Sequence, residues 1–125
     1  MKKITHLYTP GTIYEPEIRG QHGVVTIVSE LKEHDVFYYG LSLCLPGDNF
    51  SKKIGIMIAS NRCDDELAPF HGEFVYTTKQ KYQKILLYIL VDILCNIDGL
   101  PEWAKYTIEN ELVSTSLKVT GPAYD

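Results

Sequence analysis

The stretch "GVVTIVSELKEHDVFYYGLSLCL", from Gly23 to Leu45, decides which fold this chain can adopt. It contains two runs of β-branched and aromatic residues, "GVVTIVSEL" and "DVFYYGLSLCL", separated by the polar "KEH". Partly alternating runs of this composition on either side of a short polar break are typical of two strands joined by a turn. The stretch therefore predicts an antiparallel hairpin from about Val24 to Leu45.

Helical patterns dominate the sequence after this hairpin. From Ser51 to Asn61 apolar residues recur at helical spacing, and the small Gly55 and Ala59 indicate that another element packs close to this helix. A short strand is predicted at Glu73–Tyr76. The strongest helix follows at Lys79–Ile97, and Gly99 and Pro101 end it in the usual order.

The last part of the chain, "PEWAKYTIENELV", begins with proline at the first helical position and predicts an amphipathic helix. The final "KVTGPAYD" is predicted to be extended or frayed. Strands followed by helices predict an α+β fold, with an antiparallel β-sheet in the N-terminal half and C-terminal helices packed on it. A length of 125 residues predicts a single domain, residues 1–125.

Charge and cysteine content limit the function classes. The chain has 12 Lys+Arg and 16 Asp+Glu, a formal net charge of −4, whereas binding polymeric nucleic acid requires a basic face. We therefore expect no polymeric nucleic-acid partner, and a local positive pocket for a small anion stays open. Cys44, Cys63 and Cys95 are widely spaced, which favours reduced thiols in a cytosolic protein.

The predicted helix Lys79–Ile97 is apolar without interruption from Ile85 to Val91 and must be covered on every side. Its run "ILLYILVDILCNI" is too short for a membrane span and contains Asp92, so we expect no membrane partner. One small sheet covers one face only. We expect a homodimer with these helices at the interface, and a central core helix in a monomer stays equally open.

The segment after the hairpin is the candidate ligand site. The turn Pro46-Gly47-Asp48-Asn49 opens onto a helix, whose first N–H groups and positive dipole end attract anions. A hydroxyl and two cations follow at the same place, and the neighbouring Phe50 could stack on a base. These residues are Ser51, Lys52 and Lys53.

The residues by themselves favour a purely structural interpretation of this segment. Asp48 or Ser51 could cap the helix, Phe50 could pack into the core, and both lysines could be solvated. The chain has two arginines, Arg19 and Arg62, and arginine is suited to bidentate phosphate contacts. Arg19 belongs to the loop "YTPGTIYEPEIRGQHG" (Tyr8–Gly23), which either lines a binding site or forms a packed Ω-loop.

Catalytic and metal-binding patterns are weak. The four histidines are scattered. The group Cys63, Asp64, Asp65, Glu66 and His71 matches no known metal spacing well. We therefore expect no catalytic residue, no metal and no cofactor.

The segment "YGLSLCLPGDNFSKKIGIMIASNR" resembles the Thoeris anti-defence proteins of phages, sponges that sequester cyclic ADP-ribose isomers. The likeness covers about a fifth of the chain, and the N-terminal loop is a softer match. The residues that carry it are Gly40, Ser42, Cys44, Pro46, Asp48, Phe50, Ser51, Lys52, Lys53, Gly55, Ala59 and Arg62.

The resemblance implies a non-enzymatic protein that binds a glycocyclic ADP-ribose isomer in the host cytoplasm and keeps it from its effector. It also implies homodimers or larger assemblies with ligand pockets near the interface, and separate sites for cyclic oligonucleotides. One departure is that no arginine follows Arg62, so basic contacts from the C-terminal half would come from Lys105, Lys118 or another lysine.

In this hypothesis Phe50 stacks on the base, and Asp48 and Asn49 form hydrogen bonds with the base or with the ribose hydroxyls. Three cationic side chains and one hydroxyl group contact the pyrophosphate. That last group consists of Arg19, Ser51, Lys52 and Arg62. Two alternatives stay open. One is a nucleotide or phosphoester hydrolase that uses His71 and Asp64–Glu66, and the other is a protein-interaction module that docks through Lys79–Ile97.

Overall fold

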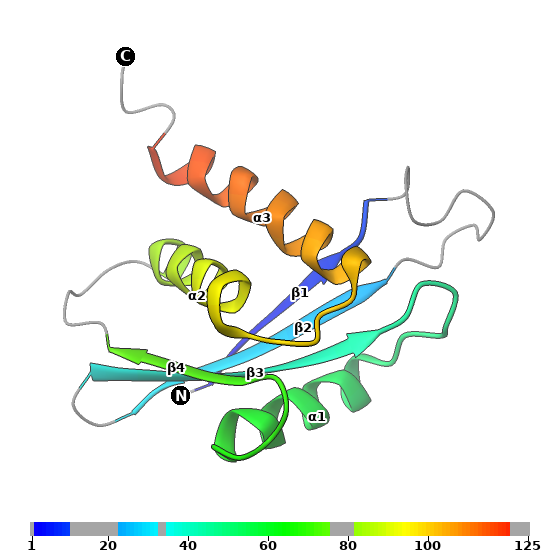
Figure 1. Ribbon diagram of the computed structural model, residues 1–125, viewed down its shortest axis with the longest axis horizontal. Helices are drawn as coiled ribbons and strands as arrows, with labels where there is room; N and C mark the ends of the chain where they lie inside the picture. The colour runs from blue at the N-terminus through cyan, green and yellow to red at the C-terminus, as the bar shows by residue number, and fades with distance from the viewer. Residues whose placement is uncertain (1, 11–22, 33–34, 76–81, 121–125) are drawn as a thin grey trace.

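The computed structural model describes residues 2–10, 23–32, 35–75 and 82–120. In this part of the chain a four-stranded antiparallel sheet, in the order β1-β2-β3-β4, carries helices on both faces (Figure 1). The strands are β1 (Lys3–Tyr8), β2 (Val24–Leu31), β3 (Val36–Cys44) and β4 (His71–Val75). The helices are α1 (Lys52–Asp64), α2 (Tyr82–Asn96) and α3 (Glu102–Thr120). The predicted α+β class and the central hairpin are confirmed.

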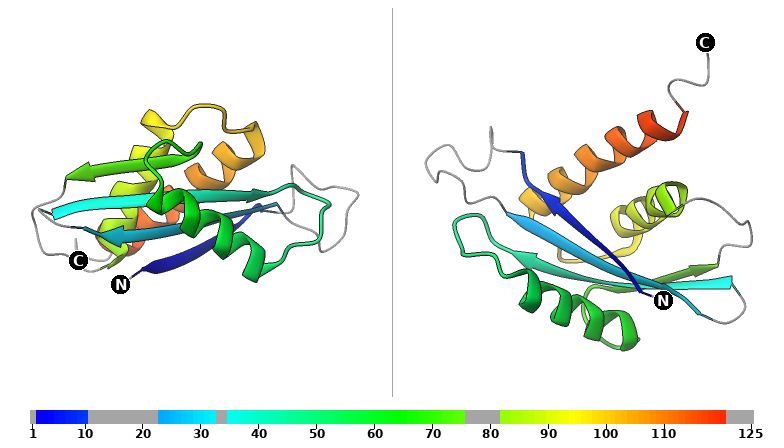
Figure 2. Two further views of the ribbon diagram at one scale, coloured as in Figure 1. Left: turned by 90° about the horizontal axis from the view of Figure 1, so that it is seen from below. Right: turned by 180° about the vertical axis from the view of Figure 1, so that it is seen from behind.

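The main core lies between the sheet and the pair α2 and α3, which cover one face (Figure 2). Strand residues of one parity, such as Ile27 and Leu41, point into it, while their neighbours point to the other face. Tyr39 is fully buried there, and its hydroxyl donates a 2.5 Å hydrogen bond to Asp92 of α2. Burial and this contact raise the pKa of Tyr39, so the phenol stays protonated and links α2 to β3.

Helix α1 covers the opposite face and packs unusually close to β2 and β3. Its buried residues are the small Gly55, Ala59 and Cys63, four residues apart. A side chain at Gly40 would meet the backbone of Ala59 and Cys63, so glycine on the strand permits this approach. The predicted close packing is confirmed, whereas the larger apolar residues Ile54 and Met57 are exposed.

Several boundaries differ from the predicted ones. Strand β1 was not predicted, because its sequence "KITHLY" begins and ends with polar or amphipathic residues. Helix α1 continues to Asp64 rather than Asn61, and β4 begins at His71 rather than Glu73. The tail was predicted to be extended or frayed, and residues 118–120 continue α3 rather than being extended. Residues 11–22, and with them Arg19, lie outside the described part.

The helices can be compared with what a membrane-spanning segment requires. None of the helices within the described residues combines the length and the apolar character that crossing a membrane requires.

Candidate ligand-binding site

A tight turn connects β3 to the loop before α1. The N–H of Asp48 donates to the carbonyl of Leu45 at 3.1 Å, with Pro46 and Gly47 in the central positions. Gly47 has a φ of 95°, which glycine adopts without strain and which this kind of turn requires at its third residue. The Pro-Gly pair therefore sends the chain back over the end of β3.

The residue before α1 caps the start of this helix with its side chain. Ser51 is the N-cap residue, and its hydroxyl accepts a hydrogen bond from the N–H of Ile54 at 3.3 Å. This confirms the capping interpretation for Ser51. The hydroxyl proton remains able to donate to a ligand, and Lys52 and Lys53 next to it are exposed.

A cavity of about 270 Å³ lies between the end of β3, this loop and the first turns of α1. Four of the predicted ligand-binding residues line it, namely Asp48, Asn49, Phe50 and Ser51. The remaining walls are Ser42, Leu43, Cys44 and Leu45 from the strand side and Ile54, Gly55 and Ile58 from the helix. The cavity therefore brings together the predicted turn and helix start with the last residues of β3.

Phe50 lies in a cluster of aromatic rings as well as in the cavity wall. Its ring centroid is 5.4 Å from that of His6 and 6.1 Å from that of Tyr8, both in edge-to-face geometry. His6 and Tyr8 come from β1, which the sequence did not reveal as a strand. The alternation in "HLY", with Leu7 buried in the main core, is the signal that could have placed both rings on the α1 side.

His6 joins this cluster to the cation at the start of α1. Its Nδ1 lies 2.9 Å from Oγ1 of the buried Thr26. Burial lowers the pKa of His6, and the nearby charge of Lys52 lowers it further. The imidazole is therefore predominantly neutral near pH 7.

Arg62 lies at the opposite end of α1 from Ser51 and is not part of the cavity wall. Its guanidinium donates to the carbonyl of Leu41 at 2.8 Å and lies 5.3 Å from the centroid of the Phe70 ring. Phe70 has a φ of 58°, a left-handed conformation that costs roughly 1 kcal/mol in a bulky residue. Leu41 directly precedes Ser42 of the cavity, so Arg62 lies beyond one end of it.

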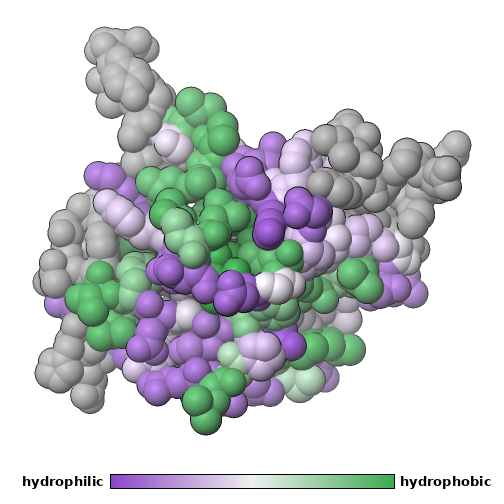
Figure 3. All heavy atoms as spheres, in the orientation of Figure 1, coloured by the Kyte–Doolittle hydropathy of each residue, from purple (hydrophilic) through white to green (hydrophobic). Residues whose placement is uncertain are grey.

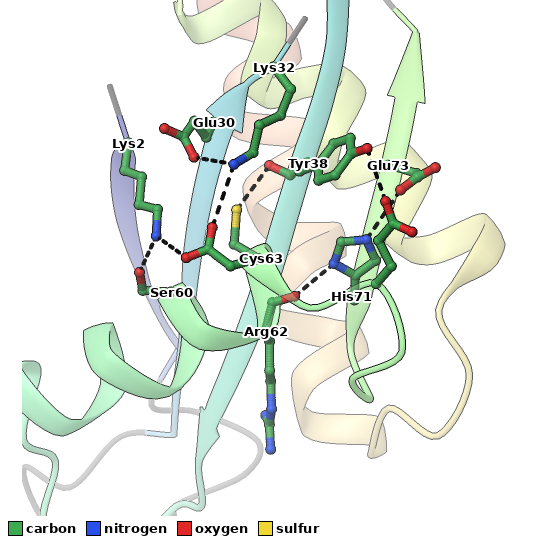
Figure 4. Close-up of polar contacts among 11 residues, drawn as sticks. Lys2, Glu30, Lys32, Tyr38, Ser60, Arg62, Cys63, His71 and Glu73 are labelled. Atoms are coloured by element: carbon green, nitrogen blue, oxygen red, sulfur yellow. Dashed lines mark hydrogen bonds and ion pairs between the residues drawn. The ribbon is translucent and has the colours of Figure 1, made fainter.

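The acidic cluster proposed for a hydrolase is occupied by contacts within the fold (Figure 4). His71 Nδ1 lies 2.7 Å from the carbonyl oxygen of Arg62, and its Nε2 lies 3.4 Å from Glu73. Glu66 accepts from the hydroxyl of Tyr38 at 3.1 Å. In the figure the Arg62 side chain extends away from this cluster.

Asp64 is held by cations rather than by the other acids. It pairs with Lys2 at 2.7 Å and with Lys32 at 3.7 Å, and the bond to Lys2 lowers its pKa. Burial raises the pKa of the neighbouring Cys63 thiol to about 11, and the charge of Asp64 adds to this. Among the described residues no three His, Cys, Asp or Glu side chains are placed to hold a metal ion.

The residues around the cavity offer several kinds of contact to a ligand. An aromatic wall, strand backbone, polar loop side chains and the positive end of a helix surround one cavity. Lys52 lies at the same helix end, Arg62 lies beyond the far side of the cavity, and Arg19 is outside the described residues. No protein-family model matches the chain, and comparisons with curated proteins and with solved structures found no match either.

Proposed function

We propose that this protein is a non-enzymatic phage anti-defence protein that binds and sequesters a cyclic ADP-ribose-type signalling nucleotide. In this proposal the glycocyclic isomers of ADP-ribose are the ligands, and their capture in the bacterial cytosol prevents activation of the host effector. The observation that carries the proposal is the cavity at the start of α1. Four of the seven predicted ligand-binding residues line it.

The chemistry of the walls suits such a ligand. Phe50 offers a ring for stacking on a base, and Asp48 and Asn49 offer polar groups at the exposed rim. Lys52 and Lys53 supply positive charge beside the α1 N-terminus, where anionic groups are stabilised. A pyrophosphate outside the cavity would lie against these cations while the base occupies the cavity.

The segment that forms the cavity is also the segment that resembles the Thoeris anti-defence proteins. The turn, the loop and all but the last two residues of α1 fall within residues 39–62, and the small residues Gly40, Gly55 and Ala59 of the resemblance lie where α1 meets the sheet. The segment that carries the resemblance therefore has a structural role in this fold. It brings a helix close to a strand and leaves a cavity at its start.

A second copy of the chain is the proposed partner. Four large apolar side chains are exposed on α2 and α3, namely Tyr88, Val91, Val113 and Leu117. We call these four residues the α2–α3 surface. Figure 3 shows apolar side chains gathered over α2 and α3 on the face turned to the viewer. A homodimer through this surface would cover the side of α2 that the sheet and α3 leave open.

Calorimetric titration with cyclic ADP-ribose and its glycocyclic isomers tests the function. The protein is then denatured by heat, and the released ligand is analysed by chromatography. We expect tight binding of at least one isomer and its recovery intact. Recovery of a cleaved product would instead establish an enzyme, and the absence of binding for every isomer would refute the proposal.

A further inference from the structure

In the part of the chain that the structure describes, the sheet has a short unpaired edge next to the cavity. Strand β4 begins at His71, opposite Gly40, and pairs with Val36–Gly40 of β3. The next N–H on this side, that of Leu41, donates to the carbonyl of Phe70 at 3.0 Å. Among the described residues, no strand therefore lies beside β3 on the β4 side beyond Leu41.

The direction of the Leu43 backbone follows from the alternation of an antiparallel ladder. The N–H and C=O of one residue point to the same side, and those of the next residue point to the other. Because the Leu41 N–H points toward β4, the Leu43 N–H and C=O do so as well. Ser42 and Cys44 point toward β2, where they face Thr26 and Val24.

The groups on either side of Leu43 are already bonded. The carbonyl of Leu41 accepts from Arg62, and the carbonyl of Leu45 accepts from the N–H of Asp48. Among the described residues the Leu43 backbone takes part in no turn, loop or cap hydrogen bond, and the alternation of the ladder turns it away from β2. The edge thus presents one donor and one acceptor between two occupied positions.

The backbone of Leu43 is the part of this residue that can face the cavity. Leu43 is one of the lining residues, and its side chain packs against the main core on the other face of the sheet. Ile54 and Ile58 line the cavity from α1, and Arg62 follows four residues later on the same side of the helix. The cavity therefore runs along the free edge of β3.

We infer that the Leu43 backbone recognises the base of the ligand, and that this base carries a donor next to an acceptor, as the amino group and ring nitrogen of adenine do. The inference rests on the proposed nucleotide-binding function and assigns the group that reads the base. An added peptide strand would need several consecutive free pairs, whereas a planar heterocycle needs one. A volume of about 270 Å³ is below that of typical pockets for whole ligands, so the sugars and phosphates lie outside.

Amide hydrogen exchange measured by NMR on the full chain tests this inference directly. In the free protein we expect the Leu43 amide to exchange faster than those of Ser42 and Cys44, which are paired with β2. Saturation with a glycocyclic ADP-ribose isomer should slow the Leu43 exchange by about tenfold or more and change its two neighbours less. An unchanged Leu43 amide in a complex that does form would overturn the inference and leave the proposed function intact.

A pair of variants gives an independent test. Leu43→Pro removes the N–H on an unpaired edge, where proline is tolerated, and Leu43→Ala removes the same apolar side chain but keeps the N–H. We expect Leu43→Pro to bind the isomer about tenfold more weakly than Leu43→Ala. Equal affinities of the two folded variants would contradict the inference. If Leu43→Pro does not fold, the hydrogen-exchange measurement on the parent protein is the deciding test.

Two related nucleosides test the contact with the Leu43 backbone by changing the ligand instead of the protein. Adenosine should compete with the bound isomer, and N6,N6-dimethyladenosine should compete about tenfold less well, because its amino group has no proton to donate to the Leu43 carbonyl. Equal competition by the two nucleosides would overturn the inference. If no isomer binds the protein in the first place, both the inference and the proposed function fail.

Discussion

The guanidinium of Arg62 donates a 2.8 Å hydrogen bond to the carbonyl of Leu41 and lies over the ring of Phe70. This contact joins the last turns of α1 to β3 at the point where β4 stops pairing. Arg62 therefore supports the fold, and a guanidinium has further N–H groups with which to meet an anion beyond the cavity. A test of whether Arg62 binds a phosphate must therefore measure the stability of each variant as well as its ligand affinity.

Arg62→Ala should lower the free energy of unfolding by about 1 kcal/mol, because the Leu41 carbonyl loses its donor. Arg62→Lys keeps the charge and can restore one hydrogen bond but not a bidentate contact. If Arg62 meets the pyrophosphate, calorimetry should show weaker binding for both variants, while urea unfolding shows a smaller loss for lysine. Unchanged affinity in Arg62→Ala would assign this residue to the fold alone.

Gly40→Ala should destabilise the protein by about 3 kcal/mol, because the added carbon meets the backbone of Ala59 and Cys63 and neither can move without shifting α1. Gly55→Ala is the matched control on the helix side. There the new carbon lies 3.1 Å from Thr26 Oγ1 and 3.2 Å from the Phe50 ring, and alanine gains about 1 kcal/mol of helix propensity.

The two glycine variants are compared by urea unfolding, and Gly55→Ala should change stability by less than about 1 kcal/mol. Similar stability of both variants would mean that α1 can move away from the sheet. Gly55→Ala should nevertheless weaken ligand binding, since the added carbon presses on the Phe50 ring that lines the cavity.

The sequence predicted those parts of the fold in which local pattern and tertiary contacts agree. The hairpin of β2 and β3 is apolar on both faces because helices cover both, and this gives long β-branched and aromatic runs. Helix α2 was recognisable from its apolar run. Strand β1 lies at the edge and is only half covered, so its six residues carry a weaker signal.

Only those residues of the candidate site that are neighbours in the sequence could be predicted. Asp48, Asn49, Phe50 and Ser51 are neighbours in sequence and line one cavity. His6 lies more than forty residues before Phe50, and only the order of the strands brings their rings together. The role proposed for Leu43 depends on β4 beginning only at His71, opposite Gly40, a boundary that side-chain patterns do not encode.

Acid should destabilise the protein partly through His6. The His6 pKa is lower in the folded chain than the ordinary value of 6.5, because burial and Lys52 oppose the imidazolium. Well above pH 6.5 the ring is neutral in both the folded and the unfolded chain, and His6 then does not change the stability. As the pH falls below this value the unfolded chain takes up the proton more readily, so the free energy of unfolding decreases.

The measurement is urea unfolding at pH 7.5 and at pH 5.5 for the parent and for His6→Asn. We expect the variant to lose less stability over this interval than the parent, since its side chain does not titrate. Lys52→Gln should also reduce the loss, because it removes the second cause of the lowered pKa. An identical loss in the parent and in His6→Asn would rule out His6 as a source of the acid sensitivity.

Self-association should depend on the α2–α3 surface. Val113 and Leu117 are 62% and 61% exposed on α3, and a charge placed among them would be unfavourable in an apolar interface. Light scattering after gel filtration should show a dimer for the parent and a monomer for Val113→Glu. Leu67→Glu is the control, because Leu67 is 95% exposed in the turn between α1 and β4. A monomeric parent, or a dimeric Val113→Glu, would contradict the proposed interface.

Phe50 decides between a stacking surface and a purely structural ring. Phe50→Ala should weaken binding of the glycocyclic isomer by about 1–3 kcal/mol, the usual contribution of one base on an aromatic ring. Tyr8→Ala separates the two roles, because Tyr8 contacts the Phe50 ring but does not line the cavity. If Phe50 stacks on the base, calorimetry should show a much larger loss for Phe50→Ala than for Tyr8→Ala, and Phe50→Trp should retain most of the affinity. Equal losses for the two alanine variants would mean that the aromatic cluster only supports the shape of the loop.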